Sequence, residues 1–437
     1  MFESIILLIF LIGLIACLTA GLSIIYALIF GIFIFSVYAS RKGFSIKEIC
    51  TMLFDGAKKV KNILKVFVCI GCLTAVWRIC GTIPYIVYKS AGFIVPEIFI
   101  FCAFALCSLL SYLTGSSFAT AGTVGTICIM LGNAAGIPQL PLGGAIMSGC
   151  YFGDRCSPMS SSALLVAEVT ETEIYTNIKN MFRTSVLPLV LTCILYLLLR
   201  SNISGVSENS SLRLFNDCFN LHWVCIIPAI ITLILCSFKV DVKKTMLIST
   251  AVGIIICIVA QNLSVVYVFK TLIFGFHPTD NPELAKLLEG GGILSMANVA
   301  CIVCLSSCFS GIFEKTGLLN QIDSQLSKLS GRISKEATFL ITSILTSMIA
   351  CNQSLATILT NDLSKSYQPD RYKRAVWMEN TVIVIAPLIP WNIAGAVPLA
   401  ILGVSSKALL FASYLYLLPA FLLISGIIHN VKEKSNK

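Results

Sequence analysis

The residues with the clearest chemical potential are two charged side chains at the end of a long uncharged part of the sequence. No Asp, Glu, Lys or Arg occurs between Ile98 and Gly153, and Asp154 and Arg155 follow directly. If this stretch lies in a membrane, a charge at its centre costs at least about 2.5 kcal/mol and needs a compensating role. Asp154 is a candidate ligand for a cation or a proton, and Arg155 could neutralise it or bind a substrate carboxylate through its planar guanidinium. The alternatives are a structural ion pair and a helix end at the membrane interface.

Hydroxyl side chains follow these charges around a proline. Pro158 lacks a backbone donor and is expected to unwind a helix. The hydroxyls and freed carbonyls beside it are then predicted to face one cavity, as in the broken helices of transporters. The hydroxyl residues are Ser157, Ser160, Ser161 and Ser162. The alternative is that small side chains here only allow close packing between helices.

The second half of the chain holds matching polar candidates. Side chains that offer both hydrogen-bond donors and acceptors cluster at Asn352, Gln353, Ser354 and Thr357. A second proline break follows at Pro387 and Pro390, with the neutral candidate ligand Asn392 beside it. Trp391 is either a gate or a packing anchor at the membrane interface.

One further acid and its neighbour belong to this second set. Glu379 follows the basic segment 371–374, and Asn380 comes directly after it. Glu379 is a candidate protonation site, with a solvated helix end as the alternative. Asn380 is a candidate neutral ligand at the same cavity.

The composition indicates that membrane-spanning helices position these candidate site residues. Of 437 residues, 57% are hydrophobic and only 12% are charged, with a mean hydropathy of +0.90, whereas soluble proteins carry about 25% charge. Runs without charge cover 4–40, 98–153 and 337–361. A spanning helix needs roughly 20 apolar residues. The sequence therefore predicts an all-α polytopic membrane protein with about 10–12 transmembrane helices, in which the lipid bilayer is the main partner.

Charge and cysteine content predict the membrane orientation and the kinds of site that are not expected. The formal net charge of +10 comes from basic residues in short loops, which by the positive-inside rule face the cytoplasm. Both termini are predicted on that side of the cell membrane, and no nucleic-acid partner is predicted. The 19 cysteines lie mostly in apolar runs, where Cys acts as a small hydrophobe. Neither a disulfide nor a structural metal site is predicted.

Two parts of the chain repeat each other weakly. Residues 77–81 resemble residues 313–317, and Ser117 to Thr120 resembles residues 354–357, at nearly equal spacing. Both parts contain apolar but Gly-, Ser- and Pro-rich segments, the composition of broken or re-entrant helices around a protected cavity. Duplicated units of this kind are typical of secondary transporters. Ser117 and Thr120 are therefore candidate site residues, with chance similarity as the alternative.

The repeat suggests a division of the chain. Residues 1–60 are predicted to form an N-terminal transmembrane hairpin and basic loop, and 61–200 the first transport repeat. Residues 201–292 are predicted to be connecting transmembrane helices, and 293–437 the second transport repeat with a C-terminal helix.

Several function classes are disfavoured by missing motifs. The sequence contains no Walker A string and no His-Glu-x-x-His or Gly-x-Ser-x-Gly string, and only three histidines. An ATPase and a His-dependent enzyme are therefore not expected, nor is a cofactor. A passive channel remains an alternative, but duplicated broken helices favour alternating access driven by an ion gradient.

Five strings resemble those of the NhaC-type sodium/proton antiporter family. They are residues 70–84, 113–120, 149–160, 290–296 and 387–392. The resemblance runs from about residue 60 to 405. It implies two inverted repeats with paired re-entrant hairpins and exchange of cations for protons, some members moving small organic acids or other solutes. A homodimer is expected by family analogy alone.

The chain departs from the family pattern at three acidic positions. Ser161 stands where the family usually has an Asp, and amides occupy one acidic position each in Asn352-Gln353 and Glu379-Asn380. Hydroxyls and amides do not titrate near neutral pH. The predicted function is a secondary active transporter that exchanges Na⁺ or another small solute for H⁺. The alternative is a Na⁺- or H⁺-coupled transporter or exchanger of organic or amino acids.

Overall fold

The chain folds into helices joined by short breaks. The computed structural model describes residues 2–20, 22–58, 60–90, 95–158, 160–199, 215–238, 240–278, 284–285, 288–317 and 331–435. Within these ranges the extended structure is limited to one isolated bridge between Phe276 and Gly290. The predicted all-α class is therefore confirmed.

The helices of the first half run from the N-terminus to the segment before residue 200. They are α1 (Phe2–Thr19), α2 (Ile24–Arg41), α3 (Ile46–Lys58), α4 (Lys61–Ile79), α5 (Thr82–Ser90), α6 (Phe99–Thr114), α7 (Ser117–Thr120), α8 (Thr126–Ala134), α9 (Gln139–Cys156), α10 (Ser161–Thr170) and α11 (Ile174–Leu198). A π-helical turn, η2 (Ala121–Gly125), joins α7 to α8, and a 3₁₀ turn, η1 (Pro96–Ile98), precedes α6.

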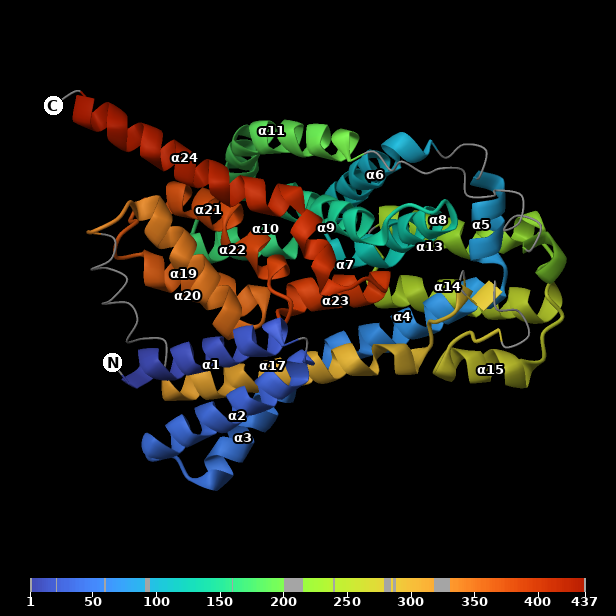
Figure 1. Cartoon of the computed structure of the whole chain (residues 1–437), viewed down its shortest axis with the longest axis horizontal. Helices are drawn as coiled ribbons and strands as arrows, with labels where there is room; N and C mark the ends of the chain where they lie inside the picture. Colours follow the sequence, from blue (N-terminus) through green and yellow to red (C-terminus); the bar gives the residue numbers. More distant parts are fainter. Residues whose placement is uncertain are drawn as a thin grey trace.

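The second half has the same character. Its helices are α13 (Ile227–Ser237), α14 (Val242–Val259), α15 (Val265–Phe274), α17 (Ala297–Thr316), α19 (Lys335–Ala350), α20 (Gln353–Ser364), α21 (Arg371–Asn380), α22 (Val382–Ile385), α23 (Ile393–Leu402) and α24 (Ser413–Ser435). The 3₁₀ turns are η3 (Trp223–Ile226), η4 (Ile293–Met296), η5 (Ala386–Leu388) and η6 (Ser406–Phe411). Helix α1 begins and α24 ends at the same end of the molecule, opposite α5 and α8 (Figure 1).

Several helices have the length and composition to cross a bilayer. In the described part of the chain four helical stretches qualify singly: Ile24–Arg41, Pro96–Thr114, Ile174–Leu198 and Ile293–Phe313. The pair Arg371–Leu388 and Ile393–Leu402 qualifies together but is bent by 53°. These helices make the protein a polytopic membrane protein. The number of crossings, predicted as ten to twelve, stays a prediction, since only these stretches of the described chain qualify by length and composition.

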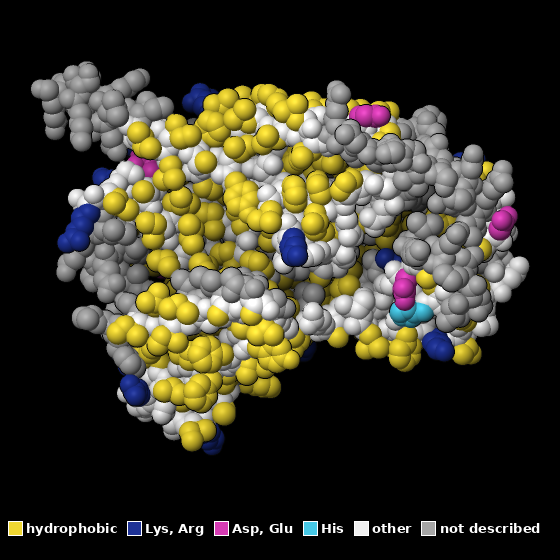
Figure 2. Space-filling view, in the orientation of Figure 1, with side chains coloured by type: hydrophobic (Ala, Val, Ile, Leu, Met, Phe, Trp, Pro, Cys, Tyr) yellow, Lys and Arg dark blue, Asp and Glu magenta, His cyan; other side chains and the backbone are white. Residues whose placement is uncertain are grey.

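The outer surface fits a lipid environment. Large apolar side chains such as Phe33, Leu198 and Val266 are exposed, and hydrophobic side chains cover much of the visible face, where charged ones are few (Figure 2). Exposed apolar surface of this extent is expected where lipid tails replace water.

The predicted breaks occur, and their geometry is similar in the two halves. Helix α6 ends at Gly115 in the left-handed conformation, and Ser116 then caps α7. Helix α19 likewise ends at Cys351, with φ of +54°, and Asn352 caps α20. Each cap satisfies backbone N–H groups that would otherwise lack a partner in the bilayer.

A second break follows in each half. Helix α9 ends at Ser157, and Ser160 caps α10 through hydrogen bonds from the backbone N–H groups of Ser162 and Ala163. The turn η5 ends at Ile389, and Asn392 caps α23. The chain thus places a capping hydroxyl or amide at all four breaks.

Helices α6 and α9 pack closely because α9 presents glycines to α6. A side-chain carbon at Gly149 would lie 2.6 Å from the carbonyl oxygen of Phe104, and one at Gly153 would meet the backbone of Ser111 and Tyr112. The Ser111 hydroxyl also donates to the carbonyl of Cys150 at 2.5 Å. This small-xxx-small contact fixes the end of α9 that carries Asp154.

We expect Gly153→Leu to prevent correct folding of the protein. A new side chain there meets backbone that cannot move aside. The loss of folding free energy should therefore reach or exceed the value of about 1–3 kcal/mol that is usual for overpacking a core position. Size-exclusion chromatography and thermal unfolding of the detergent-solubilised variant measure this. Gly122→Ala is the matched control, because its added carbon meets the flexible end of Met246. A monodisperse Gly153→Leu protein with wild-type stability would contradict the packing argument.

Candidate functional site

The first site element is a carboxylate held by three hydroxyl groups. Asp154 is 4% exposed, at the last turn of α9. Ser160 donates to its Oδ1 at 3.0 Å, and Ser162 donates to its Oδ2 at 3.0 Å. Ser117, at the start of α7, donates to Oδ2 at 3.4 Å. Two helix breaks of the first half therefore meet at one carboxylate.

The local sequence explains this arrangement. Because α9 unwinds after Cys156, the chain reverses and brings the N-terminus of α10 back beside Asp154. The cap Ser160 and the next inward residue, Ser162, then both reach the carboxylate. A helix N-terminus carries partial positive charge, which favours a carboxylate there.

The second site element is a buried carboxyl group without a partner. Glu379 lies on α21 and is 1% exposed. Neither of its carboxyl oxygens accepts a hydrogen bond from any described residue. Its electrostatic neighbours are Arg155 and Asp154. A buried carboxylate without a hydrogen-bond partner is costly.

Arg155 is held by protein groups other than Asp154 in the described contacts. Among the described residues it forms no ion pair with Asp154, because consecutive helical residues point about 100° apart. Its guanidinium is fully buried and is surrounded by neutral acceptors. They are the carbonyl of Glu379 at 3.0 Å from Nε, the hydroxyls of Thr184 at 3.1 Å and Tyr414 at 3.3 Å, the hydroxyl of Ser185 and the Asn380 side-chain oxygen.

These bonds occupy the guanidinium and tie α9 to α11, α21 and α24. The expected structural ion pair with Asp154 is therefore absent from the described contacts, and so is a free fork for a substrate carboxylate. Asn380 acts here as an acceptor for Arg155. The tyrosine and the hydroxyls that surround Arg155 were not singled out from the sequence, which shows only polar residues inside apolar helices.

The second-half candidates are held by backbone groups. Asn352 accepts from the N–H groups of Ser354 and Leu355, and the Gln353 amide donates to the carbonyl of Ile383 at 2.9 Å. The remaining bonds are from Thr357 to the Gln353 carbonyl, from Asn392 to the Ser347 carbonyl and from Trp391 to the Met348 carbonyl. Ser354 is exposed. In the described contacts these side chains do not hydrogen-bond to Asp154.

Three first-half candidates remain to be placed. Ser161 is exposed at the start of α10, whereas its neighbour Ser162 faces Asp154. Thr120 is buried and donates to the Ser116 carbonyl at 3.0 Å. Ser157 is buried at the end of α9.

The two halves meet around this centre. The hydroxyl of Tyr151, on α9, donates to the Ala394 carbonyl on α23 at 2.5 Å. Within the second half, the N–H of Ile393 donates to the Cys351 carbonyl at 2.9 Å, which joins the two breaks there. The described residues contain no group of three His, Cys, Asp or Glu side chains arranged as metal ligands, and the described cysteines are free.

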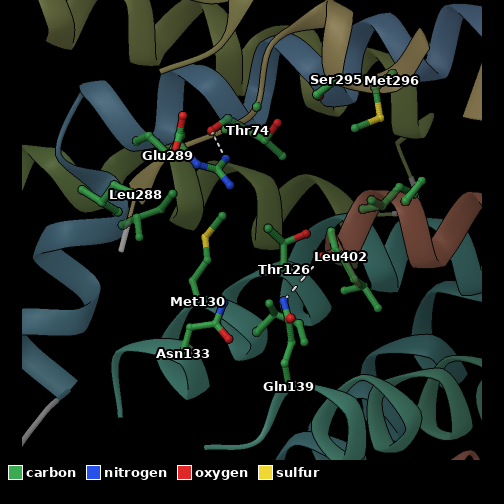
Figure 3. A pocket seen from close by; sticks show the side chains of 18 residues that line it. Thr74, Thr126, Met130, Asn133, Gln139, Leu288, Glu289, Ser295, Met296 and Leu402 are labelled. Atoms are coloured by element: carbon green, nitrogen blue, oxygen red, sulfur yellow. Dashed lines mark hydrogen bonds between the residues drawn. The ribbon is translucent and has the colours of Figure 1, made fainter. Parts of the chain in front are cut away.

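A polar cavity of about 340 Å³ lies apart from this centre. It is enclosed by α4, α8, the segment before η4 and the end of α23. Thr126, Asn133, Gln139 and Glu289 are among the side chains around it (Figure 3). At its edge, Glu289 lies 2.8 Å from Nδ1 of His277, and this contact raises the pKa of His277 above its usual value.

Paired helix breaks around buried carboxyl groups in an all-α membrane protein define a membrane transporter. A family model described as the Na⁺/H⁺ antiporter family matches residues 149–429, and the chain belongs to this family. It is 29% identical over 388 residues to the malate-2H⁺/Na⁺-lactate antiporter of Bacillus subtilis (strain 168), covering 86% of this chain and 82% of that protein.

Two further relatives show the breadth of the family. The Na⁺/H⁺ antiporter NhaC of Alkalihalophilus pseudofirmus is 26% identical over 385 residues, covering 86% of this chain and 83% of the relative. The arginine/ornithine antiporter ArcD of Halobacterium salinarum is 27% identical over 376 residues, covering 80% and 76%. The chain is thus a secondary transporter, as its sequence predicts.

Proposed function

We propose that this chain exchanges Na⁺ for protons by alternating access, with Asp154 as the binding group that the two ions share. The observation that carries the proposal is the buried Asp154 carboxylate with three hydroxyl groups around it. A hard cation prefers oxygen ligands, and unwound helix backbone adds carbonyls. A proton on the same carboxylate removes its charge and excludes the cation, so occupancy by one ion displaces the other.

Glu379 supplies the second protonation site in this proposal. It is buried, lacks a hydrogen-bond partner among the described residues and is close enough to Asp154 for their charges to interact. With both carboxyl groups protonated in the sodium-free state, one turnover moves two protons against one Na⁺. The exchange would then transfer net charge across the membrane.

The resemblance to relatives with organic substrates supports a second candidate. Two relatives are named for malate and lactate and for arginine and ornithine, and Ser161, Asn352 and Asn380 are neutral. In that case the same two carboxyl groups couple Na⁺ or H⁺ movement to an organic or amino acid. A passive channel would give flux without saturation or counterflow.

We also propose a membrane location and orientation for the transporter, and the absence of a cofactor and of enzymatic activity. The transporter lies in the cytoplasmic membrane with both termini inside, works without a cofactor and catalyses no chemical reaction. Helix α1 begins and α24 ends at one end of the molecule (Figure 1), and the basic residues Arg41 and Lys42 end α2. Repeats at 61–200 and 293–437, and a homodimer, remain predictions that await direct measurement.

Purified protein in proteoliposomes with a pH gradient and a pH-sensitive dye tests the central proposal. External Na⁺ should collapse the gradient, and empty liposomes should not respond. Lithium and potassium define the cation selectivity. An unchanged gradient with all three ions would overturn Na⁺/H⁺ exchange and favour the organic-substrate candidate, which uptake of amino and carboxylic acids would then test.

A further inference from the structure

The cavity beside α4 and α8 contains a guanidinium that makes few contacts with the described residues. Arg78, in the last turn of α4, lines the cavity. Its Nη1 donates to the Thr74 carbonyl at 2.6 Å, which is its one hydrogen bond with the described residues. Among those residues it forms no ion pair with Glu289, which contacts His277 instead. Arg78 thus differs from Arg155, whose donors are bound by protein groups.

Two glycines lie beside this guanidinium and the helix that carries it. A side-chain carbon at Gly290 would begin 3.8 Å from Nη2 of Arg78. The next glycine, Gly291, would place such a carbon 2.7 Å from the backbone nitrogen of Ala75. The Gly290-Gly-Gly segment therefore packs closely against α4 beside Arg78.

The other polar groups around the cavity divide into donors and acceptors. The Asn133 side-chain amide is exposed and bonds to none of the described residues, so it can donate. The hydroxyls of Thr126 and Ser295 already donate to backbone carbonyls at 2.9 Å and 2.7 Å, and therefore face a ligand as acceptors. Glu289 is a further acceptor. The cavity offers a carboxylate-binding guanidinium on one side and acceptors for a donor group elsewhere.

We infer that this cavity binds a small carboxylate that carries a neighbouring hydrogen-bond donor, a 2-hydroxy or 2-amino acid, with Arg78 holding the carboxylate. A planar guanidinium matches a carboxylate with two parallel bonds. The volume of about 340 Å³ is at the small end of ligand cavities, roughly 300–1,000 Å³. The site is separate from the ion site at Asp154 and does not depend on the function proposed for that residue.

The position of the cavity suggests that it communicates with the ion site. The segment α7–η2–α8 begins with Ser117, beside Asp154, and continues to Asn133, about 24 Å further along a helix. Helix α23 likewise starts at the central break and ends at the cavity with Leu402. The segment α7–η2–α8 and helix α23 therefore connect the two places, and α8, which lines the cavity, lies away from the start of α1 and the end of α24 (Figure 1).

Equilibrium binding to the purified full chain tests the inference. Radiolabelled L-lactate, L-alanine and propionate are the probes. Wild type should bind L-lactate, L-alanine or both, and either result supports the site while naming the donor group. Arg78→Lys should weaken binding about tenfold or more, and Arg78→Gln about a hundredfold, because charged paired hydrogen bonds are lost.

Controls separate the possible causes of a loss. Arg332→Gln removes an exposed arginine elsewhere and should bind like wild type. Binding is measured at equilibrium without Na⁺ or a pH gradient, so failure of the ion-exchange proposal is distinguishable from failure of this one. Where Arg78→Gln does not elute as folded protein, Asn133→Ala at an exposed position provides the second test and should weaken binding.

Three results would overturn the inference. They are no binding of L-lactate or L-alanine to wild type at millimolar concentration, equal affinity of wild type and Arg78→Lys, and equally tight binding of propionate, which lacks the donor group.

Discussion

Replacing Asp154 with Asn is expected to abolish Na⁺-dependent collapse of the pH gradient while the protein remains folded. The amide keeps the shape of the carboxylate, and the hydroxyls of Ser117, Ser160 and Ser162 can still bond to it. It removes the charge that attracts a cation and the oxygen that accepts a proton. A unit charge pair at 4 Å is worth about 4 kcal/mol at an effective dielectric constant of 20, so cation affinity should fall about a thousandfold.

The control for this substitution lies seven residues further along the chain. Ser161→Ala removes an exposed hydroxyl beside the site residues and should leave exchange unchanged, whereas Ser162→Ala removes a direct contact to Asp154 and should weaken cation affinity. Undiminished exchange by Asp154→Asn in the proteoliposome assay would show that the ions bind elsewhere.

The part of the site that lies close together in sequence was the most predictable. Asp154, Ser160 and Ser162 fall within nine residues around Pro158. The helix break predicted that the serine hydroxyls face one cavity, and in the structure two of them contact Asp154. The pattern alone did not separate Ser161 from Ser162. A break allows several orientations of the next helix, and only packing of α10 decides which hydroxyl faces inward.

The contacts of Arg155 were beyond sequence reasoning. Its partners come from residues 181–185, 379–380 and 414, which are distant in the chain. A charge in an apolar helix signals a need for compensation, but it does not say whether another charge or several neutral acceptors supply it. Here neutral acceptors supply the hydrogen bonds, with Glu379 as an acidic neighbour. Asp154 forms no ion pair with the described residues.

The Arg78 cavity illustrates the same limit. The repeat drew attention to residues 77–81, and the family resemblance drew attention to Gly290. Nothing in either string indicates that they face each other across one cavity. That juxtaposition requires α4 to pack against a segment more than two hundred residues away.

Glu379→Gln is expected to make exchange insensitive to membrane potential without destroying it. Asp154 alone would then exchange one proton for one Na⁺, which moves no net charge, whereas the wild type with two carboxyl groups moves two protons per Na⁺. Because the Glu379 oxygens accept no hydrogen bond from the described residues, the amide costs no contact. Thermal stability should therefore stay close to that of the wild type.

The measurement is Na⁺ flux in proteoliposomes whose potential is set by a potassium gradient and valinomycin. Wild type should respond to the potential, and Glu379→Gln should not. Glu336→Gln, which replaces another buried acid in the first turn of α19, should respond like wild type. If Glu379→Gln keeps the wild-type voltage response, Glu379 carries no transported proton. The contribution of that position is then its backbone carbonyl, which accepts a hydrogen bond from Nε of Arg155. If the wild type itself is insensitive, one carboxyl group accounts for the coupling, and Asp154 must alternate between the proton and the cation by itself.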